Sequence, residues 1–174
     1  MISNLFFDLD NTLIASLADW EITGKEEGDF LLLDLPSGEA YKLFIRPGAL
    51  NVINYARALV GIDKVFILTA ATKNYALKIN ELAGFRFNPK NIFSREDMRD
   101  IPCGYGYQTP SFKGWARENV LIDDLSYESH TQKAKFIGTD KEHFLQIPSY
   151  KGIEYSWSDF ENKVYKFLDK KMKE

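Results

Sequence analysis

The sequence predicts an α/β fold with a central parallel sheet flanked by helices. Short apolar runs rich in aromatic and β-branched residues alternate with segments whose apolar residues recur at helical spacing. This alternation is typical of a parallel sheet whose two faces are both covered. Polar residues follow the ends of three of the runs. In a parallel sheet such positions meet along one edge, where ligands bind.

The first part of the chain is expected to form a strand and then a β-hairpin. Residues 4–9 are predicted to be a short buried strand that ends where carboxylates begin. Segments 29–35 and 39–45 are predicted to pair as a hairpin, because Pro36-Ser37-Gly38 between them favours a tight turn. The hairpin ends at Arg46-Pro47-Gly48.

A helix and a second buried strand follow. Pro47 suits the first turn of a helix, and Gly61 suits its end. Between them, apolar residues recur at helical spacing, at Leu50, Ile53, Ala56 and Val60. The run 65–68 is then predicted to be a buried strand, closed by Thr69.

The remaining elements alternate in the same way. A helix with apolar positions at Ala76, Ile79, Leu82 and Ala83 is expected to end at Gly84. Short strands are predicted at 91–93, 120–122 and 134–137, and residues 95–112 are predicted to be an irregular segment. The last element is a helix over 157–168 with a lysine-rich end.

Composition limits the class of protein. The 174 residues fit a single domain, 1–174, with an insertion at about 15–45. A net charge of −3 gives no electrostatic reason to expect a stable nucleic-acid partner. The single cysteine, Cys103, cannot form an intrachain disulfide, and no apolar run is long enough to span a membrane. We therefore expect a cytoplasmic protein without a membrane partner.

The polar residues at the predicted sheet edge suggest phosphoryl chemistry. Asp8 and Asp10 follow the first strand, Thr69 follows the second, and Asp123 and Asp124 follow the strand at 120–122. Carboxylates gathered this closely repel unless a cation lies between them, and oxygen ligands without His or Cys favour Mg²⁺. Asp8 could attack phosphate and form an aspartyl-phosphate, while Asp10 protonates the leaving oxygen and then activates water. Thr69 could hold the phosphate.

These residues resemble the motifs of the haloacid dehalogenase (HAD) superfamily of phosphatases. Residues 7–13, Phe-Asp-Leu-Asp-Asn-Thr-Leu, resemble its first motif, DxDxT, and Thr69 after an apolar strand resembles the second. Asp123-Asp124 resembles the acidic fourth motif. The resemblance covers roughly residues 4–125. It implies a Rossmann-like core, phosphoric monoester hydrolysis, and a Mg²⁺ site formed by Asp8, Asp10, Asp123 and Asp124.

The third motif of that superfamily is a lysine. Lys113 is the favoured candidate, because the lysine of these phosphatases lies upstream of the acidic motif and Lys113 lies ten residues before Asp123. Lys90 and Lys73 are the alternatives. The predicted catalytic residues are therefore Asp8, Asp10, Thr69 and Lys113.

The insertion narrows the expected substrates. A short β-hairpin flap in place of a large cap implies an open site that admits a phosphate carried on a protein or a nucleic-acid end. The chain is similar to the small phosphatases of the FCP1/SCP type (NLI-interacting-factor-like), in Arg46-Pro47-Gly48, in Leu68-Thr69-Ala70-Ala71 and in Asp123-Asp124. Those enzymes act on phosphoserine segments, which implies a phosphoprotein substrate. Asn11 stands where that family usually has glutamate.

Other functions stay open at this point. The chain also resembles 5'(3')-deoxyribonucleotidases, in the Arg-Pro-Gly sequence, in a lysine upstream of residues 121–124 and in Trp157-Ser158-Asp159. That resemblance implies a nucleoside monophosphate substrate, and a polynucleotide 3'-phosphatase is a further alternative. The alternative outside enzymes is a catalytically silent HAD-like binding module. The presence of Asp8, Asp10 and Thr69 together argues against it.

Overall fold

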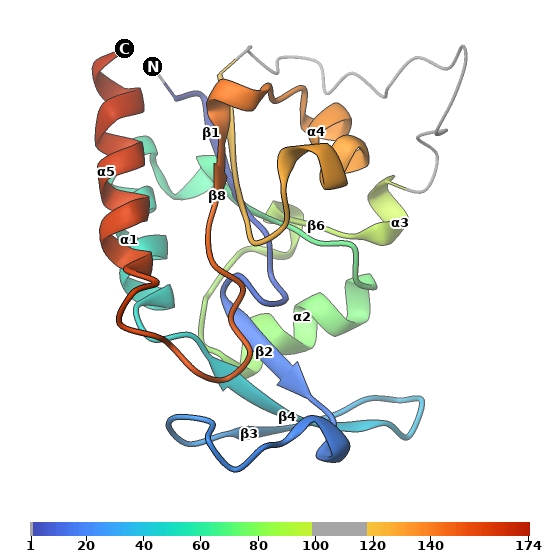
Figure 1. Ribbon diagram of the computed structural model, residues 1–174. Coiled ribbons are helices and arrows are strands. Elements are labelled where there is room, and N and C mark those ends of the chain that lie inside the picture. Colours follow the sequence, from blue (N-terminus) through green and yellow to red (C-terminus); the bar gives the residue numbers. More distant parts are fainter. Residues whose placement is uncertain (1, 99–117) are drawn as a thin grey trace.

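A computed structural model describes residues 2–98 and 118–174 and has a five-stranded parallel sheet at its centre (Figure 1). The strands lie in the order β6-β5-β1-β7-β8. Their bounds are β1 Asn4–Phe7, β5 Val65–Leu68, β6 Ile92–Phe93, β7 Asn119–Asp123 and β8 Phe144–Gln146. The chain therefore starts in the middle of the sheet with β1. It adds β5 and β6 on one side and then β7 and β8 on the other. This is a Rossmann-like order, and it confirms the predicted α/β class.

Helices cover both faces of this sheet. Apolar residues of α1 (Ala49–Val60), α2 (Lys73–Leu82) and α5 (Phe160–Lys173) belong to the cluster on one face, and α1 and α5 lie side by side (Figure 1). The shorter helices α3 (Arg95–Met98) and α4 (Thr131–Ile137) belong to the cluster on the other face. Single 3₁₀ turns occur at Asp19–Glu21, Ile62–Lys64, Pro89–Asn91, Tyr127–His130 and Lys141–His143. None of the helices in the described ranges is long and apolar enough to cross a membrane.

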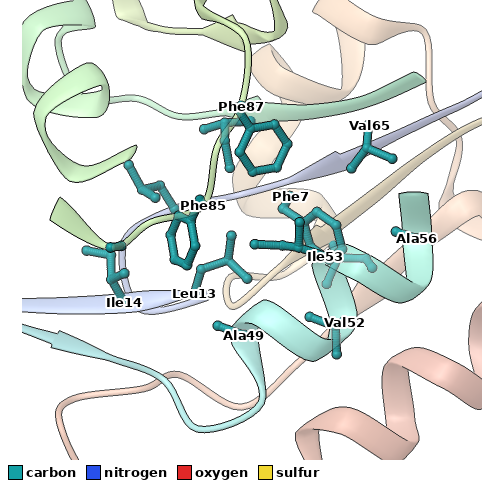
Figure 2. Close-up of a cluster of buried hydrophobic side chains, with 14 of the residues drawn as sticks. Phe7, Leu13, Ile14, Ala49, Val52, Ile53, Ala56, Val65, Phe85 and Phe87 are labelled. Carbon is teal, nitrogen blue, oxygen red and sulfur yellow. The ribbon is translucent and has the colours of Figure 1, made fainter. Parts of the chain in front are cut away.

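The alternation of side chains along β1 produces two hydrophobic cores. Leu5 and Phe7 belong to the larger cluster, whereas Phe6 belongs to the smaller one on the opposite face. Figure 2 shows the larger cluster, in which Phe7 lies close to Ile53 of α1. Burial of a Leu, Ile or Phe side chain contributes about 1.5–3 kcal/mol. The cores thus stabilise the strand that carries the polar residues after Phe7.

The insertion after β1 forms a small antiparallel sheet, which we call the flap. Its strands are β2 (Ile14–Leu17), β3 (Leu31–Asp34) and β4 (Ala40–Ile45), in the order β2-β4-β3. The predicted hairpin corresponds to β3 and β4, which pair around the turn at Pro36-Ser37-Gly38. β2 was not predicted. It lies against β4 with Ile14 opposite Ile45, so the flap is one strand larger than expected and still has no helical cap.

One predicted strand is wrong. Residues 134–137 belong to α4, and the fifth strand of the central sheet is β8, which the sequence did not indicate. Ala134, Phe136 and Ile137 are buried while Lys135 is exposed, a pattern that a short helix and a short strand can both produce. The predicted strands at 65–68, 91–93 and 120–122 and the three longer predicted helices are confirmed.

Candidate active site

The site is built at the carboxyl ends of three adjacent strands. Asp8 follows β1 and Thr69 follows β5, while Asp123 is the last residue of β7. β1 lies between β5 and β7, with Phe7 opposite Ile67 on one side and Ile122 on the other. The strand order reverses at β1, which is the place where ligands bind in sheets of this type. The predicted convergence of Asp8, Thr69, Asp123 and Asp124 is therefore present.

These residues line a small pocket of about 160 Å³. Its wall is formed by Asp8, Asp10, Asn11, Thr69, Ala70, Ala71, Asp123, Asp124, Leu125 and Lys133. It combines four carboxylates with one ammonium group. A pocket of this charge suits a ligand that brings in both a cation and an anion, such as a metal ion with a phosphate.

Asp8 is held by two side chains and is only 5% exposed. The Thr12 hydroxyl donates to Asp8 Oδ2 over 2.9 Å, and the Lys133 ammonium donates to Asp8 Oδ1 over 2.5 Å. The turn after β1 brings Thr12 back: Asn11 has a φ of 63°, in the left-handed region, and Leu13 N donates to Leu9 O over 2.9 Å. Both carboxylate oxygens of Asp8 are thus oriented before any ligand arrives.

Lys133 is the residue that the sequence analysis missed. Its ammonium group also donates to Asp123 Oδ2 over 2.9 Å, so it bridges the carboxylates that follow β1 and β7. Burial by itself would lower the pKa of Lys133, but the charges of Asp8 and Asp123 outweigh that effect and raise it. With α4 assigned as a helix, Lys133 falls one turn before buried Ile137 and beside Ala134. The spacing of these positions places Lys133 on the buried side of a helix. Because residues 134–137 were predicted to be a strand, this pattern was not recognised.

Of the three lysines named from the sequence, the structure describes Lys73 and Lys90, and both lie away from Asp8. Lys113 lies outside the described residues, so its role stays a prediction. The Lys90 ammonium lies 3.6 Å from Asp63 at the opposite end of β5. The Lys73 ammonium donates to the carbonyls of Pro89 and Ile92 and lies 3.8 Å from Asp97. Neither of these two lines the pocket of Asp8.

Three buried carboxylates could hold a metal ion together. Ligand atoms of Asp8, Asp123 and Asp124 all lie within 4.8 Å of one another. Burial raises the pKa of Asp8 to about 7, and Lys133 opposes this shift while Asp123 adds to it. Burial also raises the pKa of Asp124. One ammonium cannot balance three carboxylates, and an all-oxygen donor set of this kind fits Mg²⁺.

Asp10 lies beside this group of three carboxylates, not within it. Its Oδ1 accepts a hydrogen bond of 2.5 Å from the Tyr75 hydroxyl of α2, and its carboxylate lines the same pocket. Burial raises the pKa of Asp10, and the Tyr75 hydrogen bond lowers it. The structure thus separates the four predicted metal ligands into a group of three and a neighbour, Asp10, that is oriented independently.

Thr69 is fixed by the sheet and by the turn that leads to α2. Its backbone N–H donates to Phe93 O over 3.0 Å, and its hydroxyl accepts from Ala71 N over 3.1 Å. Thr72 is the N-cap residue of α2. The hydroxyl of Thr69 is buried against the pocket wall, where it can contact a ligand placed between Asp8 and Ala71.

A larger groove of about 530 Å³ adjoins the pocket. It lies between the flap and α2, with Arg95 at one side, and shares Asp10 and Ala71 with the pocket. Its walls are formed by Ser16, Leu35, Pro36, Ser37, Glu39 and Tyr41 from the flap and by Thr72, Asn74 and Tyr75 from the α2 side. A ligand bound in the pocket can therefore extend past Asp10 into this groove.

Arg46 connects the site to the C-terminal part of the chain. It is 2% exposed, and its guanidinium donates to both carboxylate oxygens of Glu154, over 2.5 and 3.1 Å. A third nitrogen donates to Thr12 O over 3.2 Å and to Pro148 O over 2.9 Å. The guanidinium also lies 4.2 Å from the centre of the Phe160 ring. Arg46 therefore anchors the turn that presents Thr12 to Asp8.

Replacement of Arg46 by Ala is expected to destabilise the protein. Removing one partner of a buried ion pair typically costs about 3–5 kcal/mol, because the other charge is left without compensation. Urea unfolding followed by circular dichroism measures the loss. The double variant Arg46→Ala/Glu154→Gln is the control, since it removes the uncompensated carboxylate and should recover part of the loss. A single variant as stable as the native chain would contradict the anchoring role.

A model of the NLI interacting factor-like phosphatase family matches residues 3–173. The structure of the fission yeast RNA polymerase II CTD phosphatase Fcp1 bound to beryllium fluoride is similar, with a TM-score of 0.55, 16% identity, and coverage of 99% of this chain and 50% of that one. Another structure of Fcp1, described as an essential RNA polymerase II CTD phosphatase, has a TM-score of 0.57 and 18% sequence identity. That comparison covers 97% of this chain and 48% of the other. The chain thus spans about half the length of these structures, which share its fold. No curated protein matches the sequence.

Proposed function

The chain belongs to the NLI interacting factor-like phosphatase family, and from this membership we propose that it is a Mg²⁺-dependent phosphomonoester hydrolase that works through an aspartyl-phosphate at Asp8. The observation that carries the proposal is the carboxylate of Asp8. It stands at the end of the central strand, with one oxygen bonded to Lys133 and the other to Thr12. A carboxylate oriented in this way can attack a phosphorus atom without further rearrangement.

In the first half of the reaction, a carboxylate oxygen of Asp8 attacks the phosphorus and the bond to the leaving oxygen breaks. Asp10 donates its proton to that oxygen. Asp10 must be protonated at this moment, and the burial that raises its pKa favours the protonated form. The ammonium of Lys133 offsets the negative charge of the phosphoryl oxygens, and the hydroxyl of Thr69 orients the phosphoryl group.

In the second half, Asp10 takes a proton from water and the resulting hydroxide attacks the phosphorus of the aspartyl-phosphate. The bond between phosphorus and the Asp8 oxygen breaks, which releases inorganic phosphate and restores the free carboxylate. In both halves of the reaction, the Tyr75 hydrogen bond holds the carboxylate of Asp10, a residue that lines both the pocket and the groove.

The residues that would hold Mg²⁺ are Asp8, Asp123 and Asp124. A bound Mg²⁺ supplies neutralisation of the negative charge on the phosphoryl oxygens and on the surrounding carboxylates. Asp123 is well prepared for this role, because Leu125 N donates to its Oδ1 over 3.0 Å while Lys133 donates to its Oδ2.

Mg²⁺ is expected to raise the melting temperature, and to raise it more at about pH 8 than at about pH 5.5, since protons compete with the metal for carboxylates. The folded-state pKa of Asp8 is raised from 3.8 to about 7, so its contribution to the stability of the metal-free protein is present below about pH 4 and is lost as the pH rises through about 7. Added Mg²⁺ compensates for this loss at the higher pH. Thermal unfolding in EDTA and in Mg²⁺ at both pH values measures the effect.

The control for that experiment is Asp124→Asn, which removes one of the three carboxylates and should reduce the Mg²⁺-dependent increase at the higher pH. An increase that is equal at both pH values, or equal in Asp124→Asn, would contradict a carboxylate-bound metal.

We further propose that the phosphate is carried by a protein or another macromolecule. Support comes from the flap, which lacks a helical cap, and from the long groove that continues past Asp10. The name of the similar yeast protein, a phosphatase of the RNA polymerase II CTD, points in the same direction. Nucleoside monophosphates are the second candidate, because a small nucleoside would also fit within the groove volume of about 530 Å³.

A panel of substrates tests the choice. With Mg²⁺ present, kcat/KM is measured for phosphoserine peptides, nucleoside monophosphates and 3'-phosphorylated oligonucleotides. The proposal expects the highest value for the peptides. A clear preference for free nucleotides would overturn the macromolecular substrate and leave the phosphatase assignment intact.

A further inference from the structure

A second pocket lies at the opposite end of the sheet from Asp8. It has a volume of about 330 Å³ and is lined by Arg57, Ile62, Asp63, Arg86, Phe87, Asn88 and Asn91. Ile62 and Asp63 come just before β5 and Asn91 comes just before β6, whereas Thr69 follows β5. The four residues of β5 span roughly 13 Å at the usual rise of a strand. This pocket is therefore separate from the candidate active site.

The charge of this pocket is positive and not compensated. Within the described part of the chain, neither Arg57 nor Arg86 forms an ion pair, whereas Asp63, the acidic residue of the lining, pairs with Lys90 over 3.6 Å. One guanidinium nitrogen of Arg57 donates to Phe85 O over 2.8 Å, and the group lies 4.6 Å from the centre of the Phe87 ring. Burial lowers the pKa of Arg57. The whole chain, by contrast, has a net charge of −3.

The backbone at Arg86 is unusual for an arginine. Its φ is 58°, a left-handed conformation that glycine adopts without strain and most other residues avoid. Neighbouring Phe85 and Phe87 are buried in the larger core (Figure 2). Asn80 holds Phe87 in place: its amide donates to Phe87 O over 3.0 Å and its carbonyl accepts from Phe87 N over 2.9 Å.

This conformation presents the Arg86 side chain to the pocket, away from the core. Backbone strain that the surrounding structure maintains is a common property of binding sites. Arg86 lies between two buried phenylalanines and lines the same cavity as Arg57.

We propose that this pocket binds a phosphate group at a site distinct from Asp8. Two guanidinium groups that lack carboxylate partners provide the planar donors that phosphate oxygens accept. The wall also contains Ile62 and Phe87, whose apolar side chains suit a phosphate attached to an organic group as well as inorganic phosphate, and Asp63, whose carboxylate is paired with Lys90. The proposal does not depend on catalysis at Asp8, since no residue is shared between the two sites.

Titration of the full chain with inorganic phosphate, followed by amide NMR, tests the proposal. Saturable shifts are expected at residues 86–91, separate from any shifts near residues 69–71. Arg86→Gly should weaken the response at 86–91 by at least about tenfold. The same variant should melt at an equal or higher temperature, because glycine relieves the left-handed backbone, so the loss of binding cannot result from unfolding. Arg86→Lys keeps the charge and should bind with intermediate affinity.

The source of the phosphate is distinguished with a peptide that carries a non-hydrolysable phosphonate analogue of phosphoserine. Affinity at 86–91 that is at least about tenfold above that of inorganic phosphate would identify a substrate-borne group. Equal affinity would identify free phosphate. The absence of shifts at 86–91 with both probes, or shifts that persist unchanged in Arg86→Gly, would overturn the proposed site.

Discussion

Asp8→Asn is expected to reduce kcat by roughly 10³-fold or more, the scale of loss found when a nucleophile is removed. Asparagine has the shape of aspartate and can still accept the Thr12 hydrogen bond, but its amide cannot form an acyl phosphate with the substrate. Lys133 keeps its second partner, Asp123, over 2.9 Å. The variant should therefore fold normally and lose only the chemistry. Hydrolysis of an aryl phosphate in the presence of Mg²⁺ measures the effect, and mass spectrometry of the quenched reaction detects the phosphorylated protein.

The matched control is Asp34→Asn, which replaces an exposed carboxylate on β3. It should retain native activity and, in a quenched reaction, the same phosphorylated peptide containing Asp8. Equal activity in Asp8→Asn and the native protein would exclude Asp8 as the nucleophile. A native protein with no activity toward any phosphomonoester would favour a catalytically silent binding module.

Lys133→Met is expected to destabilise the metal-free protein by about 3–5 kcal/mol, because it leaves buried carboxylates without their cation. Asp8 and Asp123 both lose a hydrogen-bonded counterion, and both lie in the interior. Methionine fills a similar volume, so the change tests the charge and not the packing. The free energy of unfolding in urea is measured in EDTA, and again in Mg²⁺, which should recover part of the loss.

Lys135→Met is the control for Lys133→Met, since Lys135 lies on the same helix and is exposed. It should change the free energy of unfolding by less than about 0.5 kcal/mol. Suppose that Lys133→Met changed the free energy of unfolding as little as Lys135→Met, while Lys113→Met abolished activity. Lys113, the lysine predicted from the sequence, would then be the lysine of the third motif.

The parts of the fold and site that the sequence predicted depend on short-range patterns. The first strand is an uninterrupted apolar run that stops at Asp8, and the runs before Thr69 and Asp123 have the same form. A parallel sheet necessarily gathers the residues after its strands at one edge. This rule, with no knowledge of the strand order, was enough to bring Asp8, Thr69, Asp123 and Asp124 together.

The missed parts depend on contacts between distant segments. β2 has the sequence Ile-Ala-Ser-Leu and is a strand because β4 pairs with it. β8 is half-buried at the edge of the sheet, so its apolar pattern is weak. The ammonium group of Lys133 lies between Asp8, 125 positions earlier in the chain, and Asp123. The sequence near each of these residues carries no record of its distant partner.

Two side chains that order the surroundings of Asp8 come from late in the chain: Lys133 contacts Asp8 itself, and Glu154 contacts Arg46, which anchors the Thr12 turn. Lys133 follows Asp8 by 125 positions, and Glu154 follows Arg46 by 108. During synthesis from the N-terminus, Asp8 leaves the ribosome long before Lys133 and Glu154. Contacts over such separations form slowly, because the intervening chain must be closed into a loop before they contribute. The charged pocket around Asp8 is therefore completed only after β7 and α4 have joined the first strands of the sheet.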